Sequence, residues 1–140
     1  MTNNIRGDIF LAWPSKSRAP SLKRVVRTQS NKESNQLYTL LVVDQDAPYP
    51  ENAHESPLLM HLRVNIGYQQ TRGHELVKYN MRRTPGDIVH RYIAIVFIQE
   101  KGLIDIEDIG VPLTPECFAM EKFAKCWGLR NYLQCFKLTN

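Results

Sequence analysis

The stretch Leu37–Pro48, with the sequence LYTLLVVDQDAP, decides the fold of this chain of 140 residues. Its first seven residues carry no charge and are rich in Leu and Val, which is typical of a central β-strand buried on both faces. Asp44 and Asp46 then end the run, and a proline-rich loop follows over residues 47–57. The sequence therefore predicts a buried strand over 37–43 with two carboxylates at its end.

Two more strands are predicted along the chain. The segment His90–Ile98 is the strongest, and because side chains alternate with a period of two, His90 and Tyr92 are expected on one face. The segment Leu58–Ile66 also alternates in polarity. We expect one of its faces to carry Leu62, Val64 and Ile66, and the other to carry His61, Arg63 and Asn65.

The remaining segments predict shorter strands and one helix. Thr114-Pro115-Glu116 is expected to begin the helix, and Gly128 to end it. Its apolar stripe is Met120, Phe123, Ala124 and Trp127. Residues 8–13 form a short apolar run that ends at Pro14. An irregular edge strand is expected at 22–28, and further strands at 75–79 and 132–138. A loop with the turn Pro85-Gly86 is expected at 81–89, and a short helix or irregular connection at 103–110. The predicted fold class is an all-β-dominated sandwich with one C-terminal α-helix.

Size and composition indicate a single domain over residues 1–140. No run approaches the roughly 18 apolar residues of a membrane-spanning helix. Residues 1–7 are polar, so we expect no signal peptide and predict a cytoplasmic location. Cys117, Cys126 and Cys135 fit neither a short metal-binding motif nor a disulfide framework, which favours free and mostly buried thiols.

Basic charge is concentrated at the start of the chain. Residues 1–35 hold seven basic and two acidic side chains, although the formal net charge of the whole chain is only +4. Such a segment can attract nucleic acid or an anionic membrane surface. However, no RNA-binding aromatic motif, zinc finger or recognition helix accompanies it. A solvated basic segment is therefore the preferred interpretation, and a nucleic-acid partner is not favoured.

The polar residues at the strand ends predict a small anion-binding site. Asp44 and Asp46 lie two residues apart in extended chain, so both side chains point to one side and need partners when buried. His61 and His90 are the expected partners, because a carboxylate that accepts from one imidazole nitrogen orients the ring. The other ring nitrogens and the hydroxyl of Tyr92 are then available to donate to a phosphate or carboxylate.

Three other interpretations of these groups remain open. Two aspartates and two histidines suit a divalent metal, although no His-x-x-x-His pair is present. A hydrolase needs an activated nucleophile, and the chain has neither a Gly-x-Ser-x-Gly motif nor a cysteine near a histidine in sequence. The groups can also form a polar network that only satisfies buried backbone donors. We therefore predict no catalytic residue, no metal site and no cofactor.

The motifs LYTLLVVDQDAP at 37–48, MHLRVNIG at 60–67 and HRYIAIVFIQE at 90–100 together resemble the phosphatidylethanolamine-binding protein family. This family also includes Raf kinase inhibitor proteins and plant flowering regulators. The tail FAKCWGLRNYLQCFKL at 123–138 is similar to the family's closing helix and strand. The resemblance implies a β-sandwich of antiparallel sheets, one C-terminal helix beside a ligand pocket, and a cis peptide bond near the aspartate-proline segment.

The resemblance also implies a pocket for phosphate or phospholipid headgroups that binds without catalysis. The residues implied as ligand-binding are Asp44, Asp46, Pro48, His61, Gly86, His90 and Tyr92. The chain departs from the family at Leu59 and Met60, where a tryptophan and often a histidine are usual, and at 82–89, where Gly-Pro-Pro-x-Gly-x-Gly-x is usual. Arg82 and Arg83 either contact the anion at the rim of the pocket or point to solvent.

Two functions are therefore open. The first is a non-enzymatic regulator that binds phosphate or a phospholipid headgroup. The second is a protein-interaction or scaffold domain on the same fold with a vestigial pocket. In the second case, the basic N-terminal segment or the loop with Arg82 and Arg83 would contact a protein partner.

Overall fold

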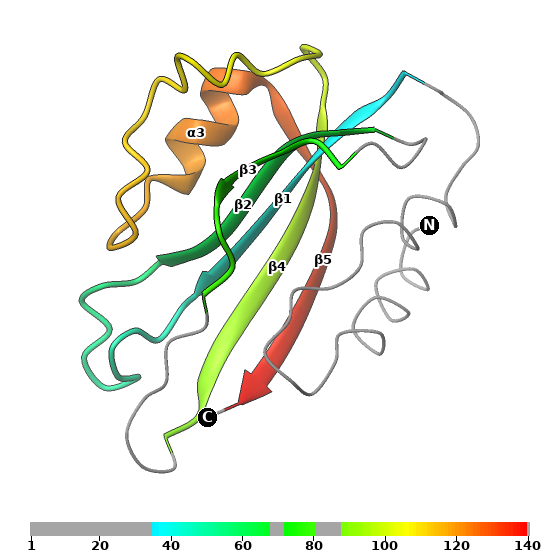
Figure 1. The fold of residues 1–140 in the computed structure, drawn as a ribbon. Coiled ribbons are helices and arrows are strands. Elements are labelled where there is room, and N and C mark those ends of the chain that lie inside the picture. Colours follow the sequence, from blue (N-terminus) through cyan, green and yellow to red (C-terminus); the bar gives the residue numbers. More distant parts are fainter. Residues whose placement is uncertain (1–34, 68–71, 81–87, 140) are drawn as a thin grey trace.

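The structure is a computed structural model that describes residues 35–67, 72–80 and 88–139. These residues form five strands and one α-helix (Figure 1). In chain order they are β1 (Leu37–Asp44), β2 (Leu58–Gly67), β3 (His74–Val77), β4 (His90–Gln99), α3 (Met120–Trp127) and β5 (Leu129–Thr139). The apolar run at 8–13 and the edge strand predicted at 22–28 lie outside the described residues, as does nearly all of the basic segment that contains them.

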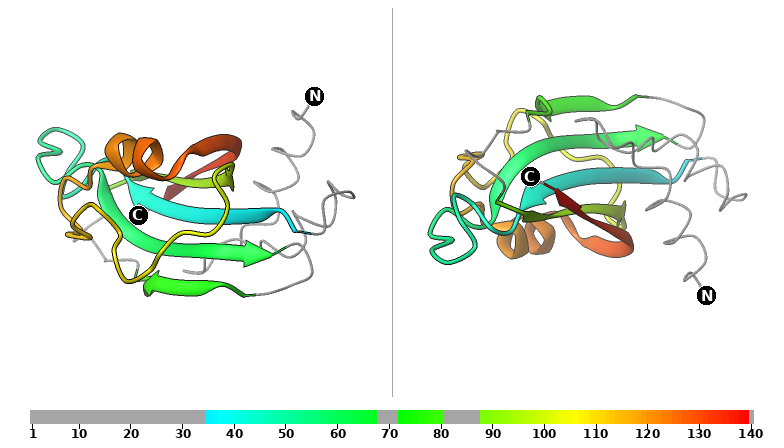
Figure 2. Two further views of the ribbon diagram at one scale, coloured as in Figure 1. Left: turned by 90° about the horizontal axis from the view of Figure 1, so that it is seen from above. Right: turned by 90° about the horizontal axis from the view of Figure 1, so that it is seen from below.

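The five strands form one antiparallel sheet in the order β3-β2-β1-β4-β5. β1 is central, and its last residue, Asp44, lies opposite Leu58 of β2 and Tyr92 of β4. Both views in Figure 2 show β1, β2 and β3 side by side in a strongly twisted sheet. The prediction of a β-dominated antiparallel fold with one C-terminal helix is confirmed.

Each face of the sheet carries its own apolar cluster. Successive residues of β1 alternate between them, as the pleat of a strand requires. One cluster contains Leu41 of β1 together with Phe123, a completely buried residue of α3. We call this side the helix face. The other cluster contains Val42 and Tyr92, and we call this side the site face.

β2 does not keep the simple alternation that its sequence predicts. Its register against β1 shifts twice, so that β2 has an extra residue at each shift. Leu62 and Val64 pack on the helix face, whereas Ile66 packs on the site face. The prediction that Ile66 shares a face with the other two is therefore wrong. Its cause lies at Asn65, whose positive φ of 58° interrupts the extended chain.

α3 begins later than predicted. Its first residue is Met120, and the preceding Ala119 makes no side-chain capping hydrogen bond. Pro115 lies before the helix, where its carbonyl accepts a hydrogen bond from the backbone of Leu59 at 2.8 Å. The prediction of a helix start at 114–116 is wrong because this segment is bonded to the start of β2 and the helical turns begin only at Met120. The predicted end is confirmed, since Gly128 adopts the left-handed conformation of a helix cap.

The other predictions have mixed outcomes. β3 overlaps the strand predicted at 75–79, β5 contains the one predicted at 132–138, and residues 103–110 form an irregular connection. All three cysteines are free, but Cys117 and Cys126 are exposed and only Cys135 is buried. The expectation of mostly buried thiols is therefore wrong. In the described part of the chain, no helix has the length and apolar character needed to cross a membrane.

Candidate anion-binding site

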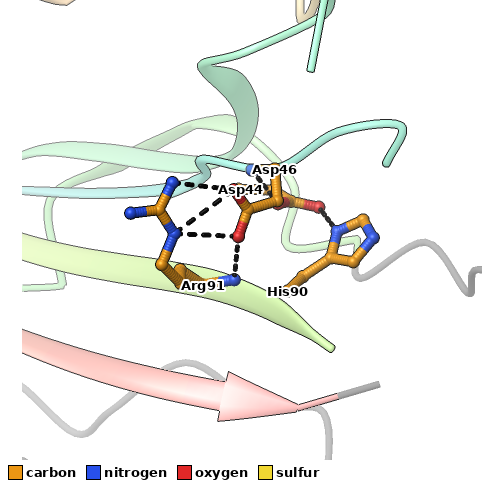
Figure 3. A network of polar contacts seen from close by, with 4 residues as sticks. All are labelled: Asp44, Asp46, His90 and Arg91. Atoms are coloured by element: carbon orange, nitrogen blue, oxygen red, sulfur yellow. Dashed lines mark hydrogen bonds and ion pairs between the residues drawn. The ribbon is translucent and has the colours of Figure 1, made fainter. Parts of the chain in front are cut away.

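Asp44 is the centre of a polar network at the end of β1 (Figure 3). Its Oδ2 accepts a hydrogen bond from Nδ1 of His90 at 2.7 Å, and its Oδ1 accepts one from the backbone N–H of Asp46 at 2.8 Å. Because an ionised carboxylate can only accept, Nδ1 of His90 must carry its hydrogen. Both side chains are buried, with His90 only 1% exposed. The network thus fixes both the orientation and the tautomer of the imidazole.

Asp46 is held by Arg91, which lies between His90 and Tyr92 on β4. The backbone N–H of Arg91 donates to Oδ2 of Asp46 at 2.8 Å, and Nη2 of its guanidinium donates to Oδ1 at 2.8 Å. Nε adds further bonds to both oxygens. These side-chain hydrogen bonds lower the pKa of the Asp46 carboxyl, against the opposing effect of burial. The expectation of a histidine partner is therefore correct for Asp44 but wrong for Asp46.

His61 makes its hydrogen bond to β3 and not to an aspartate. Its Nδ1 lies 2.9 Å from the carbonyl oxygen of Val77, so this nitrogen also carries a hydrogen. Burial lowers the pKa of the imidazole, although the bond to Val77 and the charge of Glu75 act in the opposite direction. The ring packs edge-on against Tyr79, with 5.8 Å between ring centroids. The predicted pairing of His61 with an aspartate is wrong.

Two buried polar atoms have no hydrogen-bond partner among the described residues: Nε2 of His90 and the hydroxyl of Tyr79. Tyr79 packs against the site-face cluster, which contains Tyr92, and the ring of Tyr92 stacks on His90 at 6.1 Å. Burial raises the pKa of Tyr79 and of Tyr92 to about 12, so both phenols are neutral at physiological pH. Buried polar atoms without a partner are rare and point to a bound water, ion or ligand.

The sequence marked Tyr79 only as the end of a predicted strand, and nothing in its neighbourhood singled it out. The phenol reaches the site because the chain after β3 is held along β2, where the backbone N–H of Asn80 donates to the carbonyl of Met60 at 3.1 Å. Arg91 was part of the quoted His-Arg-Tyr motif, yet only the three-dimensional structure shows that it is the partner of Asp46.

Of the remaining predicted site residues, some are described by the structure and others are not. Tyr92 is buried on the site face, and Pro48 is half-buried and follows a cis peptide bond, as the resemblance implied. Gly86, Arg82 and Arg83 lie outside the described residues. At the two positions that depart from the family, Leu59 packs on the helix face and Met60 on the site face.

Hydrogen bonds within the protein hold the side chains of this site in fixed orientations. All four carboxylate oxygens of Asp44 and Asp46 already accept bonds from the protein. Among the described residues, the buried side-chain atoms that still lack a partner are Nε2 of His90 and the hydroxyl of Tyr79. Within the described residues, no three His, Cys, Asp or Glu side chains gather as a metal site would require. When His90 is protonated, its Nε2 and the hydroxyl of Tyr79 both donate, and the arrangement then suits an oxyanion that accepts hydrogen bonds.

The sequence is similar to three plant proteins. It is 33% identical over 97 residues to Protein MOTHER of FT and TFL1 homolog 2 from Oryza sativa subsp. japonica, a match that covers 68% of this chain and 52% of that protein. Two Arabidopsis thaliana proteins are also similar. Protein TWIN SISTER of FT is 28% identical over 112 residues, covering 67% of this chain and 63% of that protein. Protein BROTHER of FT and TFL 1 is 30% identical over 96 residues, covering 66% of this chain and 51% of that protein.

The chain thus spans about half to three fifths of the length of the curated relatives it matches. No family model matches the sequence. Among solved structures, the fold is similar to that in the crystal structure of carboxypeptidase Y inhibitor complexed with the cognate proteinase, with a TM-score of 0.63 and 18% sequence identity. The match covers 81% of this chain and 65% of that chain, and it shows a shared fold.

Proposed function

Because this chain belongs to the phosphatidylethanolamine-binding protein family, we propose that it is a non-enzymatic regulatory module. It binds a phosphate group, either free or in a phospholipid headgroup. The proposed site is formed by Asp44, His90 and Tyr92. The observation that carries this proposal is Nε2 of His90, which is buried and has no partner in the described structure. A ring already fixed by Asp44 loses little freedom when it binds a ligand.

The charge of the site supports an anion as the ligand. A protonated His90, backed by the carboxylate of Asp44, can donate from Nε2 to a phosphate oxygen in a charge-assisted hydrogen bond. The second carboxylate, that of Asp46, is balanced by the guanidinium of Arg91. The network itself contains no serine, threonine or cysteine that could act as a nucleophile. These residues therefore support the binding of an anion.

An NMR titration tests the proposal. Inorganic phosphate is added to the protein while the imidazole resonances of all four histidines are followed. We expect those of His90 to shift and saturate, while those of His54 and His74, which are exposed, provide internal controls. If the shifts of His90 do not exceed those of the two controls, the binding is non-specific and the proposal is rejected. Absence of any response at about 10 mM phosphate, a weak-affinity limit, would also reject it.

The source of the phosphate group is resolved by a second titration. Phosphoethanolamine and inorganic phosphate are compared under one buffer condition, followed by vesicles that contain phosphatidylethanolamine and vesicles of phosphatidylcholine alone. Tighter binding of phosphoethanolamine and preference for the first vesicles would identify a headgroup ligand. Equal affinity for the two soluble ligands, without vesicle binding, would identify phosphate alone.

A second candidate function is supported by a surface away from this site. Leu103 is 69% exposed, the largest exposed fraction among the large apolar side chains in the described ranges. Its neighbours are fixed: the carbonyl of Gly102 accepts a hydrogen bond from Gln99, and both backbone groups of Ile104 bond to the side chain of Asn65. Ile106, in the same connection, is also exposed, and apolar surface of this kind can contact another protein when it forms a patch. This observation favours a protein-interaction module.

This second function makes a different prediction. A protein partner isolated with the natural chain should be lost when Leu103 is replaced by Asp, because a charge would enter the apolar contact. The matched control replaces Glu121, an exposed residue of α3, by Ala. Unchanged recovery with Leu103→Asp would exclude this surface.

A further inference from the structure

The hydroxyl of Tyr79 is the second buried polar atom that lacks a partner in the described structure. The phenol belongs to the short segment after β3, which the bond from Asn80 to Met60 holds against β2. A hydroxyl that is removed from water and left unpaired weakens a fold, because it loses its bonds to water and gains none. The position of this atom is therefore unfavourable unless another molecule supplies its partner.

The surroundings of Tyr79 fix the direction of its ring. One side of the ring meets the edge of His61 at an interplanar angle of 85°. His61 is itself held in place, because its Nδ1 donates to the carbonyl of Val77. The phenol thus packs against a ring whose Nδ1 is bonded within the sheet, whereas its own hydroxyl has no partner among the described residues.

Tyr79 and His90 come from different parts of the sheet but meet the same neighbour. Tyr79 packs against the site-face cluster that contains Tyr92, and Tyr92 stacks on His90. Burial is the main cause of the raised pKa of Tyr92, and Asp44, the partner of His90, and Tyr79 add to it, which is consistent with both groups lying near this phenol. The two side chains that carry the unpartnered atoms are thus both placed beside Tyr92 on the site face.

We propose that the hydroxyl of Tyr79 donates a hydrogen bond to the same oxyanion that Nε2 of His90 contacts, so that Tyr79 is a second direct ligand-binding residue and helps to select the ligand. This inference rests on the proposed phosphate-binding function. Two donors that reach one ligand from different segments favour an anion with at least two accessible oxygens, such as phosphate or a phosphate ester.

Tyr79→Phe is the sharpest test because it removes only the hydroxyl. Affinity for inorganic phosphate is measured by calorimetry for the natural chain and the variant. Loss of one hydrogen bond to a charged ligand should weaken binding about tenfold or more. The matched control is Tyr132→Phe: Tyr132 also packs against the site-face cluster, but it contacts Tyr38 near the other end of β1. This control should bind phosphate as the natural chain does.

Thermal unfolding separates a binding role from a structural one. Without phosphate, Tyr79→Phe should be at least as stable as the natural chain, because the hydroxyl has no partner to lose. With phosphate, the variant should show a smaller rise in Tm than the natural chain.

Each remaining outcome has a definite meaning. If the natural chain does not bind phosphate, the proposed function fails, and the inference fails with it. If the natural chain binds phosphate and Tyr79→Phe binds it equally well, only the inference is overturned. A clear loss of stability of Tyr79→Phe in the absence of phosphate would also overturn it, since the hydroxyl would then have a structural partner.

Discussion

Replacing Asp44 by Ala and by Asn removes different parts of the network at the end of β1. The natural carboxylate accepts two hydrogen bonds from buried groups, Nδ1 of His90 and the backbone N–H of Asp46. Ala leaves both groups unpaired. Each buried polar group without a partner costs about 1–3 kcal/mol, so Asp44→Ala should lower the free energy of unfolding by about 3 kcal/mol.

Asp44→Asn should cost much less because it preserves one bond and can replace the other. Its Oδ1 still accepts from the backbone of Asp46. Its Nδ2 carries hydrogens, and it can donate to Nδ1 of His90 if the imidazole hydrogen moves to Nε2. We therefore expect a loss of about 1 kcal/mol, a typical net contribution of one hydrogen bond. The free energies of unfolding are measured by urea denaturation of the natural chain and both variants.

The tautomer provides an independent test of the same reasoning. Long-range proton–nitrogen NMR spectra of the natural chain should show the hydrogen of neutral His90 on Nδ1, and those of Asp44→Asn should show it on Nε2. Equal losses of stability for the Ala and Asn variants would refute the role assigned to Asp44. A hydrogen that stays on Nδ1 in a folded Asn variant would refute the assigned direction of the bond.

Two further predictions concern the ion pair between Asp46 and Arg91 and the backbone at Asn65. Hydrogen bonds from Arg91 lower the pKa of the Asp46 carboxyl in the folded protein below its usual value of 3.8. The stability that this ion pair provides is therefore fully present above pH 3.8, and it is lost as the pH falls through the lower pKa of the folded state. Arg91→Gln should therefore flatten the decline of stability between about pH 5 and 2, and parallel curves from urea denaturation would contradict this. Asn65→Gly and Asn65→Ala both remove the side-chain bonds to Gln99 and Ile104, but Ala must also adopt the positive φ. Asn65→Ala should be less stable than Asn65→Gly by about 1 kcal/mol, and equal stabilities would show that this backbone conformation carries no cost.

The main strands could be predicted because burial on both faces leaves a direct trace in composition. The run Leu37–Val43 has no charge, and it became the central strand of the sheet. The errors arose where a distant segment determines the local structure. Ile66 changes faces because the side chain of Asn65 bonds to Gln99 and Ile104, which stabilises a bulge.

The site was predictable only in part for the same reason. The pair of Asp44 and His90 follows from polar residues at two strand ends that lie side by side. The partner of Asp46 depends on the path of the chain after β1, which brings its carboxylate to the backbone and guanidinium of Arg91. Tyr79 carries no sequence signal because its role comes from the absence of a partner, and a missing bond is visible only in three dimensions.

An anion site built beside two aspartates requires that their charges be compensated. The described structure does this with two consecutive residues of β4. His90 faces Asp44, while Arg91 binds Asp46 through both its backbone and its guanidinium (Figure 3). Because every carboxylate oxygen already accepts a bond from the protein, the aspartates orient the neighbouring donors of the site. The Asp-x-Asp motif and the His-Arg motif are thus two halves of one frame, and loss of either half should remove phosphate binding without exchanging it for another ligand.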